Sequence, residues 1–190
     1  KIIFTIILLL LIASSAEAAS VFIEAPEEVS AGETFPITIF ADVDNISINS
    51  TSAVIDFDED AALFPGYAPD GLISLWVNRP EGVGGRVSFE GVIPGGISGV
   101  YDPKSAGLSP IPLVKLLFTA QSGGTASFSI RESLILKNDG KGSSLYHSFG
   151  KNVEVAIEAG ESRALADSNP PAPFEIEVIE SSIFSRTPTL

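Results

Sequence analysis

Residues 35–42, Phe35-Pro36-Ile37-Thr38-Ile39-Phe40-Ala41-Asp42, decide the fold that the sequence predicts. Every odd position of this stretch is apolar, so one face of an extended strand would be apolar throughout. The same two-residue period recurs in Ala126–Arg131 and in Val153–Glu158. Alternation with one wet face is typical of antiparallel sheets that pack as a sandwich, and we expect that architecture here.

Further short β-type segments, bounded by Gly, Pro, Asn and Asp, lie on both sides of this stretch. We expect an all-β domain of about nine strands, arranged as a jelly-roll or Greek-key β-sandwich with one long loop between Val92 and Leu113. Gly123-Gly124 predicts a hairpin between its flanking strands. The expected strands are Val21–Ala25, Phe35–Asp42, Ala53–Asp58, Leu72–Asn78, Arg86–Val92, Leu113–Ala120, Thr125–Arg131, Leu134–Lys137 and Val153–Glu158.

The composition argues against several classes of function. The 190 residues include 24 Asp and Glu against 11 Lys and Arg, for a net charge of -13, which argues against binding to nucleic acid or anionic lipid. Cys is absent, which excludes a disulfide framework, a thiolate nucleophile and a Cys-based zinc site. The single His, His147, leaves no multi-His metal site and little for general-base chemistry.

The first segment predicts export. Lys1 precedes an apolar run over residues 2–13, interrupted only by Thr5, and the small-x-small pattern Ala16-Glu17-Ala18 follows. This order is typical of a secretory signal peptide cleaved after Ala18. The alternative is a membrane anchor, for which the apolar run is short. We expect a secreted, extracellular protein, attached to the cell surface through a region beyond residue 190.

The composition changes again after Glu158. Residues 160–173 include Pro170-Pro171-Ala172-Pro173, which favours an extended Pro-rich linker. Residues 174–179 then alternate once more, and we expect residues 174–190 to begin a following β module. A strand that closes the first sandwich is the alternative. The predicted division is therefore a signal peptide at 1–18, a sandwich at 19–159, a linker at 160–173 and a second module at 174–190.

The order of four stretches resembles a cohesin domain, a bacterial module in one superfamily with certain carbohydrate-binding modules. Each stretch alone is a weak pattern, and their order and spacing over most of residues 20–158 carry the resemblance. They are Val29-Ser30-Ala31-Gly32-Glu33-Thr34-Phe35, Ala53–Asp58 with its Phe57-Asp58 pair, Arg86–Val92 followed by Pro94-Gly95-Gly96, and Leu113–Ala120 followed by Gly123-Gly124-Thr125-Ala126.

This resemblance implies a nine-stranded jelly-roll sandwich that binds and does not catalyse. Cohesins of the cellulosome type bind dockerins, so the resemblance also implies a dockerin-type protein partner. One departure is that Glu59 follows the Phe57-Asp58 pair, where the family often has Pro.

Asp56, Asp58 and Asp60 form the candidate metal site. Carboxylates at this spacing are typical of the start of a calcium loop. Ala61 stands where an EF-hand requires Gly, and Tyr67 stands where it requires the bidentate Glu, so an EF-hand is excluded. The alternative is a solvated acidic strand edge without Ca²⁺, and we expect no other cofactor.

Trp76, Tyr67, Tyr101 and Glu90 are the candidate binding residues. Flat, partly exposed rings would stack on sugar faces, and Tyr67 and Tyr101 lie in loops that favour exposure. Trp76 lies in an apolar strand, where core packing is the alternative.

We therefore predict a non-catalytic extracellular binding module with a protein partner of dockerin type. The sequence does not indicate serine hydrolysis, because no Gly-x-Ser-x-Gly elbow accompanies His147. The 24 acidic residues alone do not exclude a carboxylate pair of the glycosidase type, but no pattern indicates a substrate cleft. The alternatives are a carbohydrate-binding module linked to polysaccharide breakdown and a structural spacer of a multi-domain surface protein. Exposed rings would favour the carbohydrate module, and a sheet face poor in rings would favour a protein partner.

Overall fold

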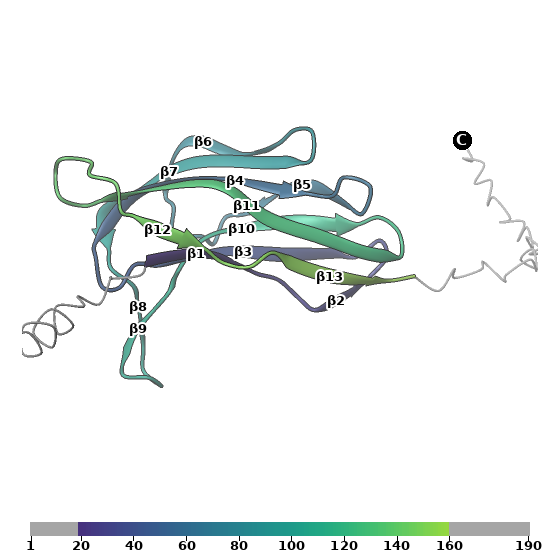
Figure 1. The fold of residues 1–190 in the computed structure, drawn as a ribbon, viewed down its shortest axis with the longest axis horizontal. Helices are drawn as coiled ribbons and strands as arrows, with labels where there is room; N and C mark the ends of the chain where they lie inside the picture. Colours follow the sequence, from purple (N-terminus) through teal and green to yellow (C-terminus); the bar gives the residue numbers. More distant parts are fainter. Residues whose placement is uncertain (1–18, 160–190) are drawn as a thin grey trace, which may run out of the picture. The chain divides into compact units, whose positions relative to one another are not determined.

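The computed structural model describes residues 19–159, and their regular structure consists of strands alone. Two sheets face each other as a sandwich, and the small β8–β9 hairpin projects from it (Figure 1). The first sheet has the order β12-β1-β3-β10-β5 and contains β1 (Ala19–Glu24), β3 (Thr34–Asp42), β5 (Ala62–Ala68), β10 (Ile111–Ala120) and β12 (His147–Phe149).

The second sheet has the order β2-β13-β11-β4-β7-β6. It contains β2 (Glu28–Ser30), β4 (Ile48–Phe57), β6 (Leu75–Gly82), β7 (Arg86–Ile97), β11 (Gly124–Lys137) and β13 (Val153–Glu158), and the separate hairpin consists of β8 (Val100–Asp102) and β9 (Gly107–Ser109).

The alternation predicted for β3 is confirmed. Its odd positions, from Phe35 to Ala41, are all buried against the second sheet, while Pro36, Thr38 and Phe40 face outward. β10 pairs antiparallel with β3 and is central in its sheet, as its nearly continuous apolar sequence indicates. A bulge in β10 shifts the register between Pro112 and Val114, so the adjacent Leu113 and Val114 are both buried.

A cluster of phenylalanine rings joins the two sheets in the core. Phe118 of β10 has its ring centroid 4.8 Å from that of Phe128 on β11 and 5.1 Å from that of Phe57 on β4. Phe35 of β3 completes the contact at 6.1 Å from Phe128, with the two rings edge to face. These contacts connect strands of opposite sheets, so the ring cluster holds the sandwich together.

The hairpin predicted at Gly123-Gly124 is wrong. β10 ends at Ala120 in the first sheet, and β11 begins at Gly124 in the second, so the segment crosses between sheets. Gly124 has a φ of 140°, a backbone conformation that glycine adopts without strain. A pair of glycines indicates a sharp turn, but it does not indicate whether the next strand pairs in the same sheet or in the opposite one.

Several strand boundaries also differ from the prediction. The predicted long loop after Val92 instead contains the end of β7 and the β8–β9 hairpin, and the two strands predicted at 125–131 and 134–137 form the single strand β11. The predicted strand Leu72–Asn78 starts and ends later, as β6. The short strands β2 and β12 and the irregular β5, which contains Pro65 and Gly66, were not predicted. Short or Pro-containing edge strands lack the alternation on which the prediction depends.

Among residues 19–159 there is no helix long and apolar enough to cross a lipid bilayer. The predicted signal peptide at 1–18, the linker at 160–173 and the second module at 174–190 lie outside the described residues, and they stay predictions.

Candidate binding surface

The outer face of the second sheet presents alternate side chains of its central strands. Ala53 and Ile55 of β4, like Val87 and Phe89 of β7, are buried between the sheets. Because successive side chains of a strand point to opposite faces, the residues between them point outward. The register sets Ser52 opposite Glu90 and Val54 opposite Ser88 on this face.

A broad, shallow hollow crosses this face over β11, β4, β7 and β6. One part of it has a volume of about 430 Å³, and an adjoining part of about 510 Å³ shares Val54, Glu81, Ser88 and Glu132 with it. We call the two parts together the sheet groove. The side chains of the groove that the argument uses are Ser52, Val54, Arg79, Glu81, Val83, Arg86, Ser88, Glu90, Arg131, Glu132 and Leu134.

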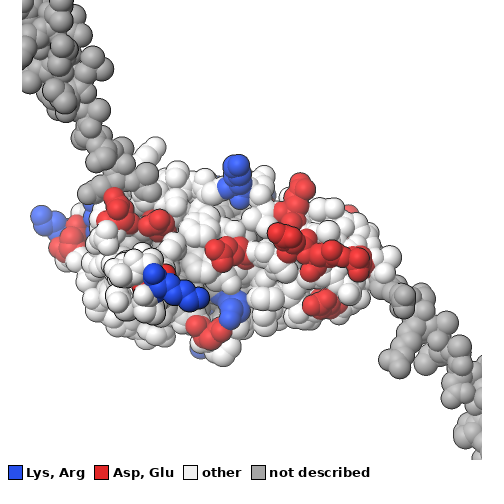
Figure 2. All heavy atoms as spheres, turned by 90° about the horizontal axis from the view of Figure 1, so that it is seen from below, with Lys and Arg blue, Asp and Glu red and all other residues white. Residues whose placement is uncertain are grey.

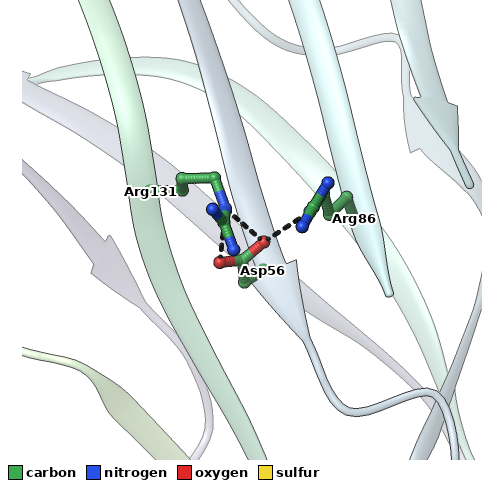
Figure 3. A network of polar contacts seen from close by, with 3 residues as sticks. All are labelled: Asp56, Arg86 and Arg131. Carbon is green, nitrogen blue, oxygen red and sulfur yellow. Dashed lines mark hydrogen bonds and ion pairs between the residues drawn. The ribbon is translucent and has the colours of Figure 1, made fainter. Parts of the chain in front are cut away.

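An ion-pair network lies at one end of the sheet groove (Figure 3). Asp56 of β4 accepts hydrogen bonds from Arg131 Nε, at 3.0 Å to Oδ1 and 2.8 Å to Oδ2, and from Arg86 Nε at 3.2 Å. Arg131 is the extra residue where the register of β11 shifts between Ile130 and Glu132. This bulge brings a second guanidinium to a carboxylate that already faces Arg86 across the β4–β7 pair.

The two guanidinium groups keep Asp56 ionised. The hydrogen bond from Arg131 lowers the pKa of Asp56 most. Burial, the next largest effect, opposes it, and the charge of Arg131 and the contact with Arg86 lower the pKa further. In return, Asp56 raises the pKa of Arg131. The carboxylate therefore fixes the orientation of two cations on the face of the sheet.

The sheet groove combines charges of both signs with apolar contact area. Every arginine of residues 19–159, namely Arg79, Arg86 and Arg131, lines it. Leu134 is 45% exposed and Val83 is 71% exposed. Exposed apolar side chains among charged ones are typical of a protein contact surface.

Glu90 is the predicted binding residue that the structure places in the sheet groove. Its Oε2 accepts a hydrogen bond of 3.1 Å from Asn78 Nδ2 of the adjacent strand β6. This bond holds the carboxylate across the β6–β7 pair.

The three predicted aromatic residues do not form one platform. Tyr67 of β5 is half-buried and not exposed as predicted, because its ring lies edge to face with that of Trp76, 5.3 Å away. Trp76 also packs edge to face on Phe89, at 6.2 Å. Tyr101 is 67% exposed, as predicted, but it lies on the separate β8–β9 hairpin. In the sheet groove the only aromatic lining residue is the buried Phe89, so the groove is poor in rings.

Asp56, Asp58 and Asp60 do not come together as the predicted calcium site requires. Asp56 is occupied by two arginines, and Asp58 Oδ1 accepts the backbone N–H of Asp60 at 2.9 Å in the turn after β4. Within the part of the chain that is described, no group of three or more His, Cys, Asp or Glu side chains is placed to hold a metal ion. Asp58 therefore accepts a hydrogen bond within its own turn, and Asp56 forms ion pairs with arginines.

Acidic side chains gather at the end of the sandwich that carries β2 and the end of β13 (Figure 2). Glu28 of β2 shares a hydrogen bond with Glu158 of β13, and that bond and the charge of Glu158 raise the pKa of Glu28. The three arginines of the described residues line the sheet groove instead. The charge of the domain is therefore unevenly distributed.

Two half-buried features were not predicted from the sequence. Phe22 of β1 and Phe40 of β3 stack on the outer face of the first sheet, with their ring centroids 5.4 Å apart and their planes 11° apart. The even positions of β3 signal this outward ring, but the prediction considered only Trp and Tyr. The single His, His147, is half-buried in β12 and hydrogen-bonds Ser133 Oγ through Nε2.

Neither a protein-family model nor a curated protein sequence matches the chain. Solved structures do match. A cohesin module from a family 33 glycoside hydrolase of Clostridium perfringens is 15% identical, with a TM-score of 0.55, over 75% of this chain and 98% of that module. A non-cellulosomal cohesin from the archaeon Archaeoglobus fulgidus is 13% identical, with a TM-score of 0.56, over 80% of this chain and 99% of that cohesin.

A third similar structure is the third ScaB cohesin of R. flavefaciens, solved in complex with a group 1 dockerin. It is 16% identical, with a TM-score of 0.52, over 76% of this chain and 98% of that cohesin. These identities are low, so the shared property is the arrangement of strands. The described residues therefore have the fold of a cohesin module.

Proposed function

We propose that the chain is a non-catalytic extracellular binding module whose sheet groove docks a protein partner of dockerin type. The observation that carries this proposal is the composition of the groove: exposed Leu134 and Val83 lie among oriented charges, and the rings that a sugar platform needs are elsewhere. Protein partners bury such mixed surfaces, with apolar anchors inside a polar rim.

The cohesin fold supports this proposal. Two of the similar structures, one from R. flavefaciens and one from Acetivibrio cellulolyticus, contain a dockerin bound to the cohesin. The predicted signal peptide supports an extracellular location, where such modules would meet their partners.

Binding of the full chain to a panel of purified dockerin modules tests the proposal, with calorimetry as the measurement. We expect at least one dockerin to bind, and Leu134→Asp to weaken that binding by about tenfold or more, which is about 1.4 kcal/mol. The matched control is Leu63→Asp, because Leu63 is 52% exposed on β5 of the other sheet. The control should change the affinity by less than about twofold.

A carbohydrate ligand is the second candidate, and the stacked Phe22–Phe40 pair favours it. This pair offers ring surface on the outer face of the first sheet, remote in topology from the sheet groove. A glycan array probed with the full chain and with Phe40→Ala tests it. Retention on a glycan that is lost in Phe40→Ala and kept in Leu134→Asp would assign the ligand to the first sheet. Failure of every dockerin to bind would contradict the protein-docking proposal.

A further inference from the structure

Two Asn-x-Ser/Thr triplets lie close together in the sequence, one before β4 and one at its start. They are Asn45-Ile46-Ser47, in the turn between β3 and β4, and Asn49-Ser50-Thr51, within β4. In exported proteins this triplet is the acceptor sequence for N-linked glycans, in which the Asn amide is modified and the hydroxyl of the third residue is required.

Asn45 occupies the tip of an exposed turn. Asp44 and Asn45 have φ angles of 47° and 65°, and the N–H of Ile46 donates to the carbonyl of Val43 at 2.9 Å, which closes a tight reversal. Both central side chains are exposed. The Asn45 amide therefore points away from either sheet, at a position where a bulky substituent displaces no core residue.

A glycosyltransferase can reach the Ser47 hydroxyl of the first triplet after only a small, local opening of the turn. Ser47 is half-buried, and its Oγ lies at the long distance of 3.5 Å from Asn138 Nδ2. The stronger link to that loop is the backbone bond from Asn138 N to the Ser47 carbonyl, at 2.8 Å. Opening the turn tip over residues 44–47 can thus free Ser47 Oγ while the backbone link remains.

The second triplet is closed in the folded domain. Asn49 Nδ2 donates to Asn138 Oδ1 at 3.2 Å, and Thr51 is 2% exposed in the core. Presenting Thr51 Oγ1 to an enzyme would require β4 to leave the centre of its sheet. The two triplets, four residues apart, therefore differ in access and not in chemistry.

We propose that Asn45 is the N-glycan acceptor of this domain. The donor is an oligosaccharide joined through its reducing-end C1 to a lipid diphosphate. The Asn45 Nδ2–C1 bond forms as the C1–oxygen bond to the diphosphate breaks, the lipid diphosphate leaves with the electron pair, and a base of the transferase takes the amide proton.

This glycan would leave the sheet groove open, because Asn45 is not among the residues that line either part of it. The proposal rests on the predicted export of the chain and is independent of the ligand that the groove takes. A Cys-free exported domain would gain protection from proteolysis at the turn that carries the sugar.

The test uses the purified, folded full chain, a single-subunit oligosaccharyltransferase that accepts Asn-x-Ser/Thr, and a synthetic lipid-linked oligosaccharide. Peptide mapping by mass spectrometry then locates the glycan. We expect modification of Asn45 with Asn49 bare in the folded chain, and modification of both in an unfolded synthetic peptide of residues 41–55. The same mapping on chain secreted by its native cells should show an occupied Asn45.

Three variants complete the design. Ser47→Ala should abolish the glycan on Asn45, Ser47→Thr should retain it, and Asn49→Gln should leave it unchanged. The thermal midpoint of each variant shows that the fold is kept. A bare Asn45 in the folded chain or in the secreted chain, or a glycan that prefers Asn49, would overturn the proposal. Since the transferase assay uses purified chain, its result does not depend on export or on dockerin binding.

Discussion

At the scale of single residues, the buried hydroxyl of Thr51 destabilises the fold, because no hydrogen bond compensates for its removal from water. The residue is 2% exposed, and its Oγ1 is the buried side-chain polar atom that has no hydrogen-bond partner among the described residues. A buried hydroxyl without a partner loses its hydrogen bonds to water and gains none in return, at about 1–3 kcal/mol. Its position in β4 opposite Gly91 and Ile135 is otherwise suited to an apolar residue.

Thr51→Val should therefore raise the free energy of unfolding by about 1 kcal/mol, because valine has the same shape without the hydroxyl. Urea unfolding followed by circular dichroism measures the change. Thr34→Val is the matched control, since Thr34 Oγ1 bonds Thr119 Oγ1 at 2.9 Å and is exposed. A destabilised Thr51→Val would show that the hydroxyl has a partner in solution.

Asp56 gives the fold a dependence on pH. Arg131 and then Arg86 hold its pKa below the ordinary value of an Asp carboxyl. A carboxyl with a lowered pKa in the folded state stabilises the fold above its unfolded pKa of about 3.9, and that contribution is lost as the pH falls through the folded value.

Asp56→Asn should lower the free energy of unfolding at pH 7 by about 1 kcal/mol, because two guanidinium groups lose their shared anion. The difference between the variant and the parent chain should shrink below about pH 4. Urea midpoints across this range test the prediction, and Asp60→Asn, in the exposed turn nearby, is the control. A difference that stays constant from pH 7 to pH 3 would exclude the ion pairs as its cause.

At the scale of elements, the parallel pair β2–β13 is held against a charge repulsion. The register sets Glu28 opposite Ala156 and Ser30 opposite Glu158, which brings the two Glu carboxyls close enough to share a hydrogen bond. The raised pKa of Glu28 means that the folded state binds its proton more tightly than the unfolded state does. The repulsion is therefore largest at neutral pH and is relieved as the pH falls through the raised value.

Glu158→Gln should raise the urea midpoint at pH 7, because the Gln amide can donate to the Glu28 carboxylate. The gain should disappear at acid pH, where Glu28 is protonated in the parent chain. Glu154→Gln is the matched control on the same strand, since Glu154 pairs with Ser127. An equal gain in the control would attribute the effect to net charge alone.

At the scale of the whole molecule, stability depends on the contact of the two sheets through the phenylalanine cluster. Phe118 is fully buried, and its ring also lies 5.4 Å from that of Phe64 on β5. The cluster thus includes strands from both sheets, and their separation would expose it.

Phe118→Ala should lower the free energy of unfolding by about 3–5 kcal/mol, a large part of the 5–15 kcal/mol that is typical of a domain. Thermal unfolding measures the loss. Phe22→Ala is the control, because Phe22 stacks on the outer surface and not between the sheets. Comparable losses for the two variants would contradict the assignment of the core.

Much of the sheet was predictable from residues 35–42, 126–131 and 153–158. Strict alternation reports the two faces of a strand directly, and in β3 and β13 the buried positions are those expected. The edge strands β2, β5 and β12 could not be predicted in this way. Their pairing depends on the neighbouring strand, and their sequences alternate weakly or contain Pro and Gly.

The candidate site was less predictable than the fold. Glu90 lies in the sheet groove, and its role in binding stays a prediction. Asp56 was assigned to calcium in the sequence-based hypothesis, and in the structure it faces Arg131, 75 positions away in the chain. Tyr67 was expected to be exposed, and Trp76 to be either a binding residue or part of the core; in the structure the two rings pack on each other. No local sequence pattern predicts the contacts of Asp56 with Arg131 or of Tyr67 with Trp76, because each contact depends on how the strands are arranged in the sandwich.

By itself, the sequence of this chain determined an all-β domain with the order of features of a cohesin, the outward and inward faces of its regular strands, and the charge that argues against nucleic acid. Only the tertiary structure decided that β10 and β11 lie in different sheets, that a bulge brings Arg131 to Asp56, and that the sheet groove spans β11, β4, β7 and β6. The physical reason is range: side-chain alternation acts between neighbours along the chain, whereas a surface formed by four strands depends on contacts between residues far apart in sequence.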